Sequence, residues 1–93
     1  MGINQTLKAL ADPVRRNILE MLKQGPKSAG EIAQAFELTP ATVSYHLSQL
    51  KKAGLLTEEK QKNYIYYSLD VTVFEEILVW FQSLGGGKGN GKK

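Results

Sequence analysis

The chain has 93 residues, of which 42% are hydrophobic, and this size and composition fit one compact domain. It contains no cysteine, which excludes disulfides, thiolate metal sites and thiol redox sensing. The net charge of +3 permits nucleic-acid binding but does not require it. Because no apolar run is long enough for a transmembrane helix and the N-terminus lacks a secretory signal pattern, we expect a cytoplasmic location.

Helices are predicted along the first part of the chain. The first covers about residues 3–11, where apolar residues recur at helical spacing. Asp12-Pro13 supplies an N-cap followed by proline at the first helical position, and the second helix that it opens ends before Gly25-Pro26. Residues 28–31 carry the Ser-x-x-Glu pattern of a capping box, which predicts a short third helix up to about Phe36.

A fourth helix, Pro40 to Ala53, follows after a very short connection. Thr39 is its predicted N-cap, and Gly54 suits the left-handed position that follows a helix. The hydrophobic period then changes from 3.6 to 2, which predicts two strands, residues 55–60 and 64–69, joined by a turn.

A last helix is predicted over residues 71–84, with Asp70 as its N-cap. The element order is therefore α-α-α-α-β-β-α, which is the layout of a winged helix-turn-helix: mainly α with a β-hairpin wing. We assign residues 1–84 to this domain. Residues 85–93 consist mostly of glycine and lysine, cannot bury apolar surface, and are predicted to form a disordered tail.

The outer side of the fourth helix indicates a function. On a helical wheel Val43, Leu47 and Leu50 form a buried stripe, and the opposite side is short, uncharged and rich in hydrogen-bonding groups. Small side chains let a helix approach base edges in the major groove, whereas a solvated surface helix, the alternative, more often carries Glu and Lys. The helix contains no acid, and its positive N-terminus can receive a phosphate. The predicted DNA-binding residues are Thr39, Pro40, Ala41, Thr42, Ser44, Tyr45, Gln49, Lys52 and, in the wing, Lys62.

Several basic positions leave alternatives open. His46, the only histidine, flanks the buried stripe, so its imidazole either packs in the domain or contacts a phosphate. No metal site is expected there, because the chain has no second histidine. Lys62, at the hairpin tip, either reaches the DNA backbone or minor groove or lies in a solvated turn. Arg15 and Arg16 either contact phosphate or belong to a solvated or salt-bridged face.

The last helix has more apolar residues than one face of a small domain can bury. An exposed apolar surface of this extent usually marks an interface, and a twofold homodimer is predicted. The alternatives are a small ligand pocket against this helix and a purely intramolecular core. The predicted dimer-interface residues are Leu7, Leu10, Phe74, Ile77, Leu78, Trp80 and Phe81.

Three stretches of the chain resemble the ArsR family of bacterial repressors: Ala9–Leu19, Leu38–Leu47 and Ile65–Leu69. The resemblance extends over about residues 7–84. It implies a homodimer joined by the first and last helices, an operator bound through the major groove, and repression by blocking transcription. Carried over by position, it implies that Ala41, Ser44 and Tyr45 face bases and that Thr39, Thr42 and Gln49 lie near bases or backbone.

The chain also departs from the family pattern. Many members sense metals through cysteines in the third helix or through His and Asp ligands in the last helix, but this chain has no cysteine and its last helix has no histidine. Metal sensing and cofactors are therefore not expected. The wing tip has Lys62-Asn63 in place of the common Gly-Arg. The short length and tyrosine-rich wing end look closest to autorepressors of the sporulation-delay (Sdp) type, in which a membrane immunity protein sequesters the repressor.

The sequence thus predicts a homodimeric, sequence-specific repressor of a palindromic double-stranded operator. A protein-interaction module that uses the apolar last helix is the second hypothesis. An enzyme is not expected, because the chain has no nucleophile–base set, no paired carboxylates in a plausible cleft, no Gly-rich phosphate loop after a strand and no metal cluster.

Overall fold

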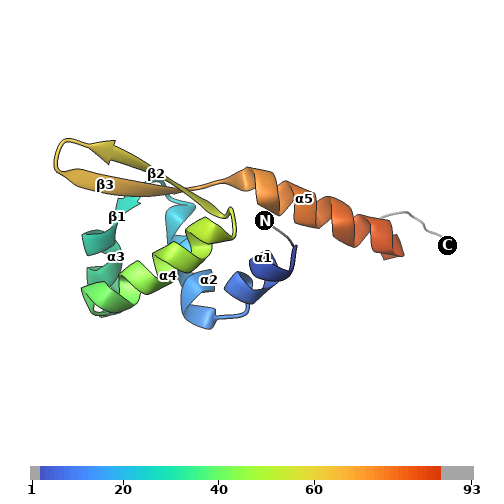
Figure 1. Cartoon of the computed structure of the whole chain (residues 1–93), viewed down its shortest axis with the longest axis horizontal. Coiled ribbons are helices and arrows are strands. Elements are labelled where there is room, and N and C mark those ends of the chain that lie inside the picture. Colours follow the sequence, from blue (N-terminus) through green and yellow to red (C-terminus); the bar gives the residue numbers. More distant parts are fainter. Residues whose placement is uncertain (1–2, 87–93) are drawn as a thin grey trace.

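A computed structural model describes residues 3–86 of the chain. The elements in order are α1 (Ile3–Leu10), α2 (Pro13–Leu22), β1 (Lys27–Ser28), α3 (Ala29–Phe36), α4 (Pro40–Lys52), β2 (Leu56–Gln61), β3 (Tyr64–Leu69), α5 (Val71–Phe81) and a π-helical turn (Gln82–Gly86). Figure 1 shows α1 to α4 gathered beneath the hairpin of β2 and β3, while α5 extends away from them. The predicted mainly helical fold with a hairpin wing is confirmed.

The helices begin where short-range hydrogen bonds satisfy their first N–H groups. The Asp12 carboxylate accepts from the N–H of Val14 at 2.8 Å, which caps α2. Both reciprocal bonds of the predicted capping box at residues 28–31 are present at the start of α3. Thr39 Oγ1 accepts from the N–H of Thr42 at 3.2 Å and caps α4. Each of these partners lies within three residues, so the helix starts could be predicted from sequence.

The turn between α3 and α4 depends on a left-handed residue. Glu37 has φ 55° and ψ 44°, and the N–H of Leu38 reaches back to the carbonyl of Ala33 at 3.0 Å. This closes the end of α3 as a Schellman motif does, with glutamate at the position that glycine usually occupies. A non-glycine residue there costs about 1–2 kcal/mol, which the packing of α3 and α4 must offset.

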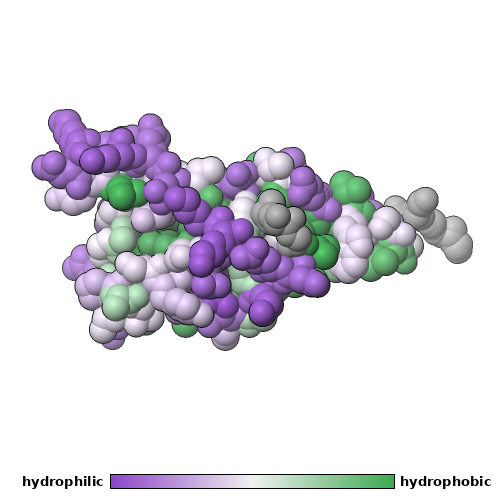
Figure 2. All heavy atoms as spheres, in the orientation of Figure 1, coloured by the Kyte–Doolittle hydropathy of each residue, from purple (hydrophilic) through white to green (hydrophobic). Residues whose placement is uncertain are grey.

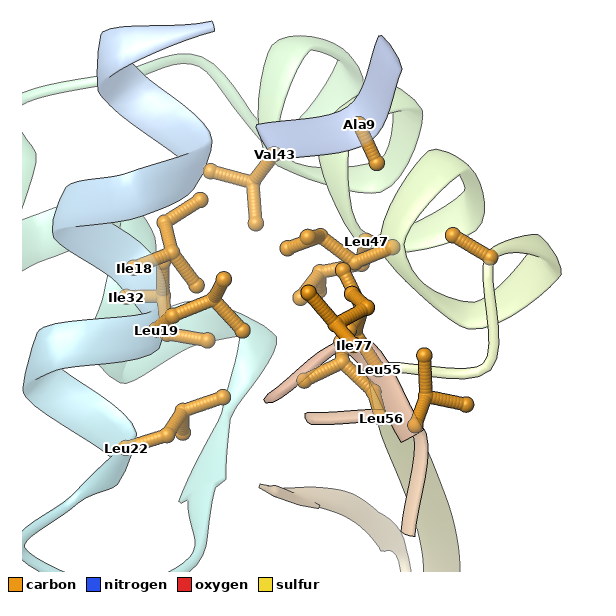
Figure 3. Packing of buried hydrophobic residues seen from close by; sticks show 13 residues of the cluster. Ala9, Ile18, Leu19, Leu22, Ile32, Val43, Leu47, Leu55, Leu56 and Ile77 are labelled. Atoms are coloured by element: carbon orange, nitrogen blue, oxygen red, sulfur yellow. The ribbon is translucent and has the colours of Figure 1, made fainter. Parts of the chain in front are cut away.

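The core lies between α2, α4 and the start of the hairpin. Figure 3 shows Ile18, Leu19 and Leu22 of α2 facing Leu47, Leu55, Leu56 and Ile77 across it. Val43, Leu47 and Leu50, the predicted buried stripe of α4, are all buried. The opposite side of α4 therefore faces outward.

A third strand, β1, was not predicted. Its two residues, Lys27 and Ser28, pair antiparallel with β3 opposite Tyr67 and Tyr66, and the sheet order is β1-β3-β2. Two residues are too few to show a hydrophobic period, so the sequence pattern predicted a hairpin alone. Because β1 leads directly into α3, the wing is attached to the helical part both before α3 and after α4.

The last helix ends earlier than predicted. α5 stops at Phe81, and the π-helical turn that follows contains Gly85 at φ 110°. Gly85 and Gly86, which the prediction placed in the tail, belong to this turn, and residues 87–93 of the predicted tail lie outside the described residues. Within residues 3–86 there is no helix of the length and hydropathy needed to span a bilayer.

Candidate nucleic-acid interface

The outward side of α4 carries the predicted reading residues. Pro40, Ala41, Ser44, Tyr45 and Lys52 are exposed, and Tyr45 retains 58% of its accessible surface. Thr42 and Gln49, which the wheel places nearer to the buried stripe, are half-buried. The structure therefore brings the predicted residues together on one continuous side of one helix.

The N-terminus of α4 uses part of its own hydrogen-bonding capacity. Thr39 Oγ1 accepts from the N–H of Thr42 and donates to Thr42 Oγ1 at 2.9 Å. The hydroxyl hydrogen of Thr39 is thus engaged within the cap, whereas Thr42 keeps a hydroxyl that can donate outward. Of these two predicted contacts, Thr42 is the better suited to reach a base or phosphate.

Two grooves flank the exposed side of α4. The first, of about 530 Å³, separates α4 from α1, and the second, of about 230 Å³, separates α4 from the wing. The first is lined by Asn4, Gln5, Lys8, Ala11, Arg15, Tyr45 and Gln49; the second is lined by Ser44, Leu47, Ser48, Lys51, Glu58 and Tyr67. Figure 2 shows hydrophilic side chains over the wing, over α1 and over the C-terminal end of α4, with a paler surface over the N-terminal part of α4. A helix inserted in a major groove has a phosphate backbone on either side. An exposed helix with a groove along each flank is compatible with that arrangement.

Arg15 and Arg16 are used to close the end of α1. Arg15 Nε donates to the carbonyl of Ala9 at 2.8 Å, and its Nη2 donates to that of Lys8 at 3.3 Å. Arg16 Nη1 donates to the carbonyl of Leu10 at 2.7 Å. These carbonyls belong to the last turn of α1, where intrahelical donors run out and the helix dipole is negative; of the three, the Lys8 carbonyl also accepts from the N–H of Ala11 at 3.2 Å. Both arginines therefore cap α1. Arg16 is also exposed, as the solvated alternative had it, and contact of either side chain with a phosphate stays a prediction.

The imidazole of His46 packs inside the domain, which was one of the two alternatives predicted for it. It is 8% exposed, and its Nδ1 lies 3.3 Å from Nη1 of Arg15. Because guanidinium only donates, this nitrogen is the acceptor. At the other end of α4 the buried Thr6 donates from Oγ1 to the carbonyl of Ala53 at 3.2 Å. Contacts at two points thus hold α1 against α4; the sequence analysis missed them, since Thr6 lies off the apolar stripe that defined the first helix.

The groove beside the wing contains an ion pair that the sequence analysis did not predict. Lys51 Nζ, near the end of α4, lies 3.2 Å from Oε2 of Glu58 on β2. Glu58 is opposite Tyr67 in the strand register, so both side chains are on the sheet face that meets α4. Burial raises the pKa of the Tyr67 hydroxyl and the charge of Glu58 raises it further, while Lys51 opposes this shift.

Lys62 is at the wing tip, as predicted. It is exposed and has φ 58° in the turn that joins β2 to β3. Residues other than glycine, asparagine and aspartate rarely adopt this backbone conformation, so it costs conformational free energy at Lys62. Its ammonium group is free to extend beyond the end of the sheet.

The predicted dimer surface is largely exposed, with one exception. Leu7 of α1 and Leu78, Trp80 and Phe81 of α5 have exposed fractions of 38–58%. Leu10 and Phe74 are partly buried against the core. Ile77, in contrast, is 9% exposed and packs inside its own chain, so it has little surface to offer a partner. Three further apolar residues of this region are exposed but were not among the predicted interface residues: Val71, Val79 and Leu84.

The chain is similar to known DNA-binding regulators over the segments described above. A protein-family model described as a helix-turn-helix domain matches residues 10–59. The chain is 40% identical to the transcriptional repressor SdpR of Bacillus subtilis, over 84% of this chain and 87% of that protein. It is 34% identical to the arsenical resistance operon repressor of the same organism, over 89% and 85% of the two chains.

Solved structures agree with the fold. The chain is similar to the ArsR family transcriptional regulator RHA00566, with a TM-score of 0.82 and 27% identity over 88% of this chain and 90% of that one. It is also similar to the homodimeric winged helix-turn-helix DNA-binding domain Mb0332 of Mycobacterium bovis, with a TM-score of 0.74 and 25% identity over 98% and 84% of the two chains.

Proposed function

This chain belongs to the ArsR family of winged helix-turn-helix transcriptional regulators, and we propose that it is a repressor that binds a palindromic operator as a homodimer and represses its own gene. The observation that carries this proposal is the exposed, acid-free side of α4 between two grooves. Similarity to the SdpR repressor supports repression as the outcome of binding. Such a protein acts on DNA in the bacterial cytoplasm.

In the proposed complex α4 lies in the major groove. Ala41, Ser44 and Tyr45 face the base edges, since they are exposed on the ridge of the helix. The flanking predicted residues contact bases or backbone: Thr39, Pro40, Thr42, Gln49 and Lys52. Lys62 contacts a phosphate or the adjacent minor groove from the wing tip.

The proposed homodimer buries the exposed apolar residues of α1 and α5. A single described chain leaves Leu78 at 58% and Phe81 at 51% exposure, which favours a twofold contact over a closed monomer. With two reading helices, the operator carries half-sites about one helical turn, roughly 34–36 Å, apart.

We further propose that release from DNA does not depend on a metal. The chain has no cysteine, and its one histidine is buried with Nδ1 turned to a guanidinium group. Residues 3–86 contain no group of three His, Cys, Asp or Glu side chains placed to hold an ion. Sequestration by a membrane immunity protein, implied by the resemblance to the Sdp type, is the release route that we propose instead.

Selection of genomic fragments bound by the purified protein tests this function. We expect enrichment of an imperfect palindrome, including one site upstream of the protein's own gene, and a dimer in sedimentation experiments. A stable monomer that enriches no sequence would refute the proposal and favour the second hypothesis, a protein-interaction module built on α5. Enrichment of sites elsewhere in the genome, but not near the protein's own gene, would support the repressor function and exclude autorepression.

A further inference from the structure

One carboxylate lies beside the proposed reading surface. α4 contains no acid, but Glu58 reaches its flank from β2. It is the single acid among the described residues that line the groove between α4 and the wing. An acid in this place is unexpected, because a phosphate backbone that borders the major groove repels it.

The groups around Glu58 are suited to a phosphate. Lys51 provides an ammonium group, and Ser44 and Ser48 provide hydroxyls that line the same groove. The Lys51 and Glu58 side chains retain 52% and 36% of their accessible surface, so solvent or a ligand can reach both. The ammonium group is therefore accessible to a backbone phosphate, but it already has a partner at 3.2 Å.

We propose that this groove receives a DNA backbone phosphate at Lys51, and that Glu58 competes with the phosphate for the ammonium group and so weakens binding to DNA of any sequence. The inference rests on the proposed function, because it assumes that α4 enters the major groove. Its consequence is selectivity: affinity that does not depend on sequence is reduced, and contacts between α4 and the bases decide where the protein binds.

The competition has a measurable electrostatic signature. When Lys51 moves to a phosphate in the unaltered protein, Glu58 is left as an uncompensated anion beside the backbone, and the site neutralises no net charge. Without that anion Lys51 neutralises one phosphate, and each neutralised phosphate contributes about 0.9 to the slope of log affinity against log salt. Removal of the Glu58 charge thus steepens the salt dependence as well as raising affinity.

The test compares two substitutions of equal charge. Glu58→Gln removes the carboxylate in the groove, and Glu59→Gln removes the next one along β2, which is opposite Tyr66 on the other face of the sheet. Dissociation constants are measured for a mixed-sequence 30-base-pair duplex between 50 and 200 mM salt. Both variants should fold, because an exposed ion pair adds little stability and Glu59 is exposed; thermal unfolding checks this.

We expect Glu58→Gln to bind the duplex about tenfold more tightly at 50 mM salt, and its slope to be steeper by about 0.9. Glu59→Gln should change affinity less than about twofold, because water and salt screen the more distant charge. Adding Lys51→Gln to Glu58→Gln should return the slope to that of the unaltered protein.

Equal behaviour of the two single variants, or higher affinity without a steeper slope, would overturn the inference while the unaltered protein still binds DNA. Failure of the unaltered protein to bind this duplex and the genomic fragments would overturn the proposed function and this inference together.

Discussion

The guanidinium group of Arg15 lies 3.3 Å from Nδ1 of His46, and the same side chain donates to the carbonyls of Lys8 and Ala9. One residue of α2 thus joins the end of α1 to the middle of α4. α1 carries exposed Leu7, which belongs to the proposed dimer surface, and α4 carries the proposed reading residues. The contact therefore fixes the position of the proposed reading helix relative to the helix that carries part of the proposed dimer surface.

Arg15→Met should destabilise the domain and weaken DNA binding. It removes donors to two carbonyls and leaves Nδ1 of the buried His46 without its partner, which we expect to cost about 1–3 kcal/mol. Urea unfolding measures this loss. Arg16→Met is the matched control, since Arg16 donates only to the carbonyl of Leu10 in an exposed position, and it should cost roughly 0.5–1.5 kcal/mol. Equal losses in both variants would show that the link to His46 contributes nothing.

Asp12→Asn should remove part of the pH dependence of stability. Burial raises the pKa of the Asp12 carboxyl, but the N–H donors of Arg15 and Val14 and the Arg15 charge together leave it below the ordinary value of 3.8. A carboxyl with a lowered folded pKa stabilises the fold above the unfolded pKa, and this contribution disappears as the pH falls through the folded value. The free energy of unfolding of the two proteins should therefore differ most at neutral pH and converge in strong acid. A constant difference between pH 7 and pH 2 would contradict this interpretation.

Ser44→Ala and Tyr45→Ala should each weaken binding to the selected operator by about 1–3 kcal/mol and relax its sequence preference. Both residues are exposed on the side of α4 that faces away from the core. Gln34→Ala, at an exposed position of α3, is the control and should bind unchanged. Fluorescence anisotropy with operator and mismatched duplexes measures both effects, and unaltered discrimination by the α4 variants would exclude them as base readers.

Lys62→Asn should weaken binding to operator and mixed-sequence duplexes alike. The substitution removes the charge at the wing tip but keeps a residue that tolerates φ 58°. Loss of one phosphate contact should make the salt slope shallower by about 0.9. If the slope is unchanged, the wing tip lies in solvent in the complex.

Leu78→Ser should separate dimerisation from folding. Leu78 is 58% exposed on α5, so its loss should convert the proposed dimer to a folded monomer at micromolar concentration. Ile77→Ala, one residue earlier, should instead cost about 2–4 kcal/mol of unfolding free energy, because Ile77 packs in the core of its own chain. Sedimentation velocity and urea unfolding distinguish the two, and a dimeric Leu78 variant would place the interface elsewhere.

Some features of this protein were determined by the sequence alone. Asp12 and Thr39 cap their helices through bonds to residues two or three positions ahead, so one turn of sequence contains both partners. The outward side of α4 follows from helical periodicity around Val43, and the surplus of apolar residues in α5 predicted a surface that one chain leaves exposed.

Only the tertiary structure decided the rest. Arg15 and His46 are 31 positions apart, and Lys51 and Glu58 belong to different elements, so their contacts depend on how α2, α4 and β2 pack. The same packing turned Ile77 inward and Leu78 outward and paired β1 with β3. Local hydrogen bonds and periodicity specify which side of α4 is free, but the angles between elements determine which charges border it, and through those charges the tertiary structure carries the proposed control of phosphate binding.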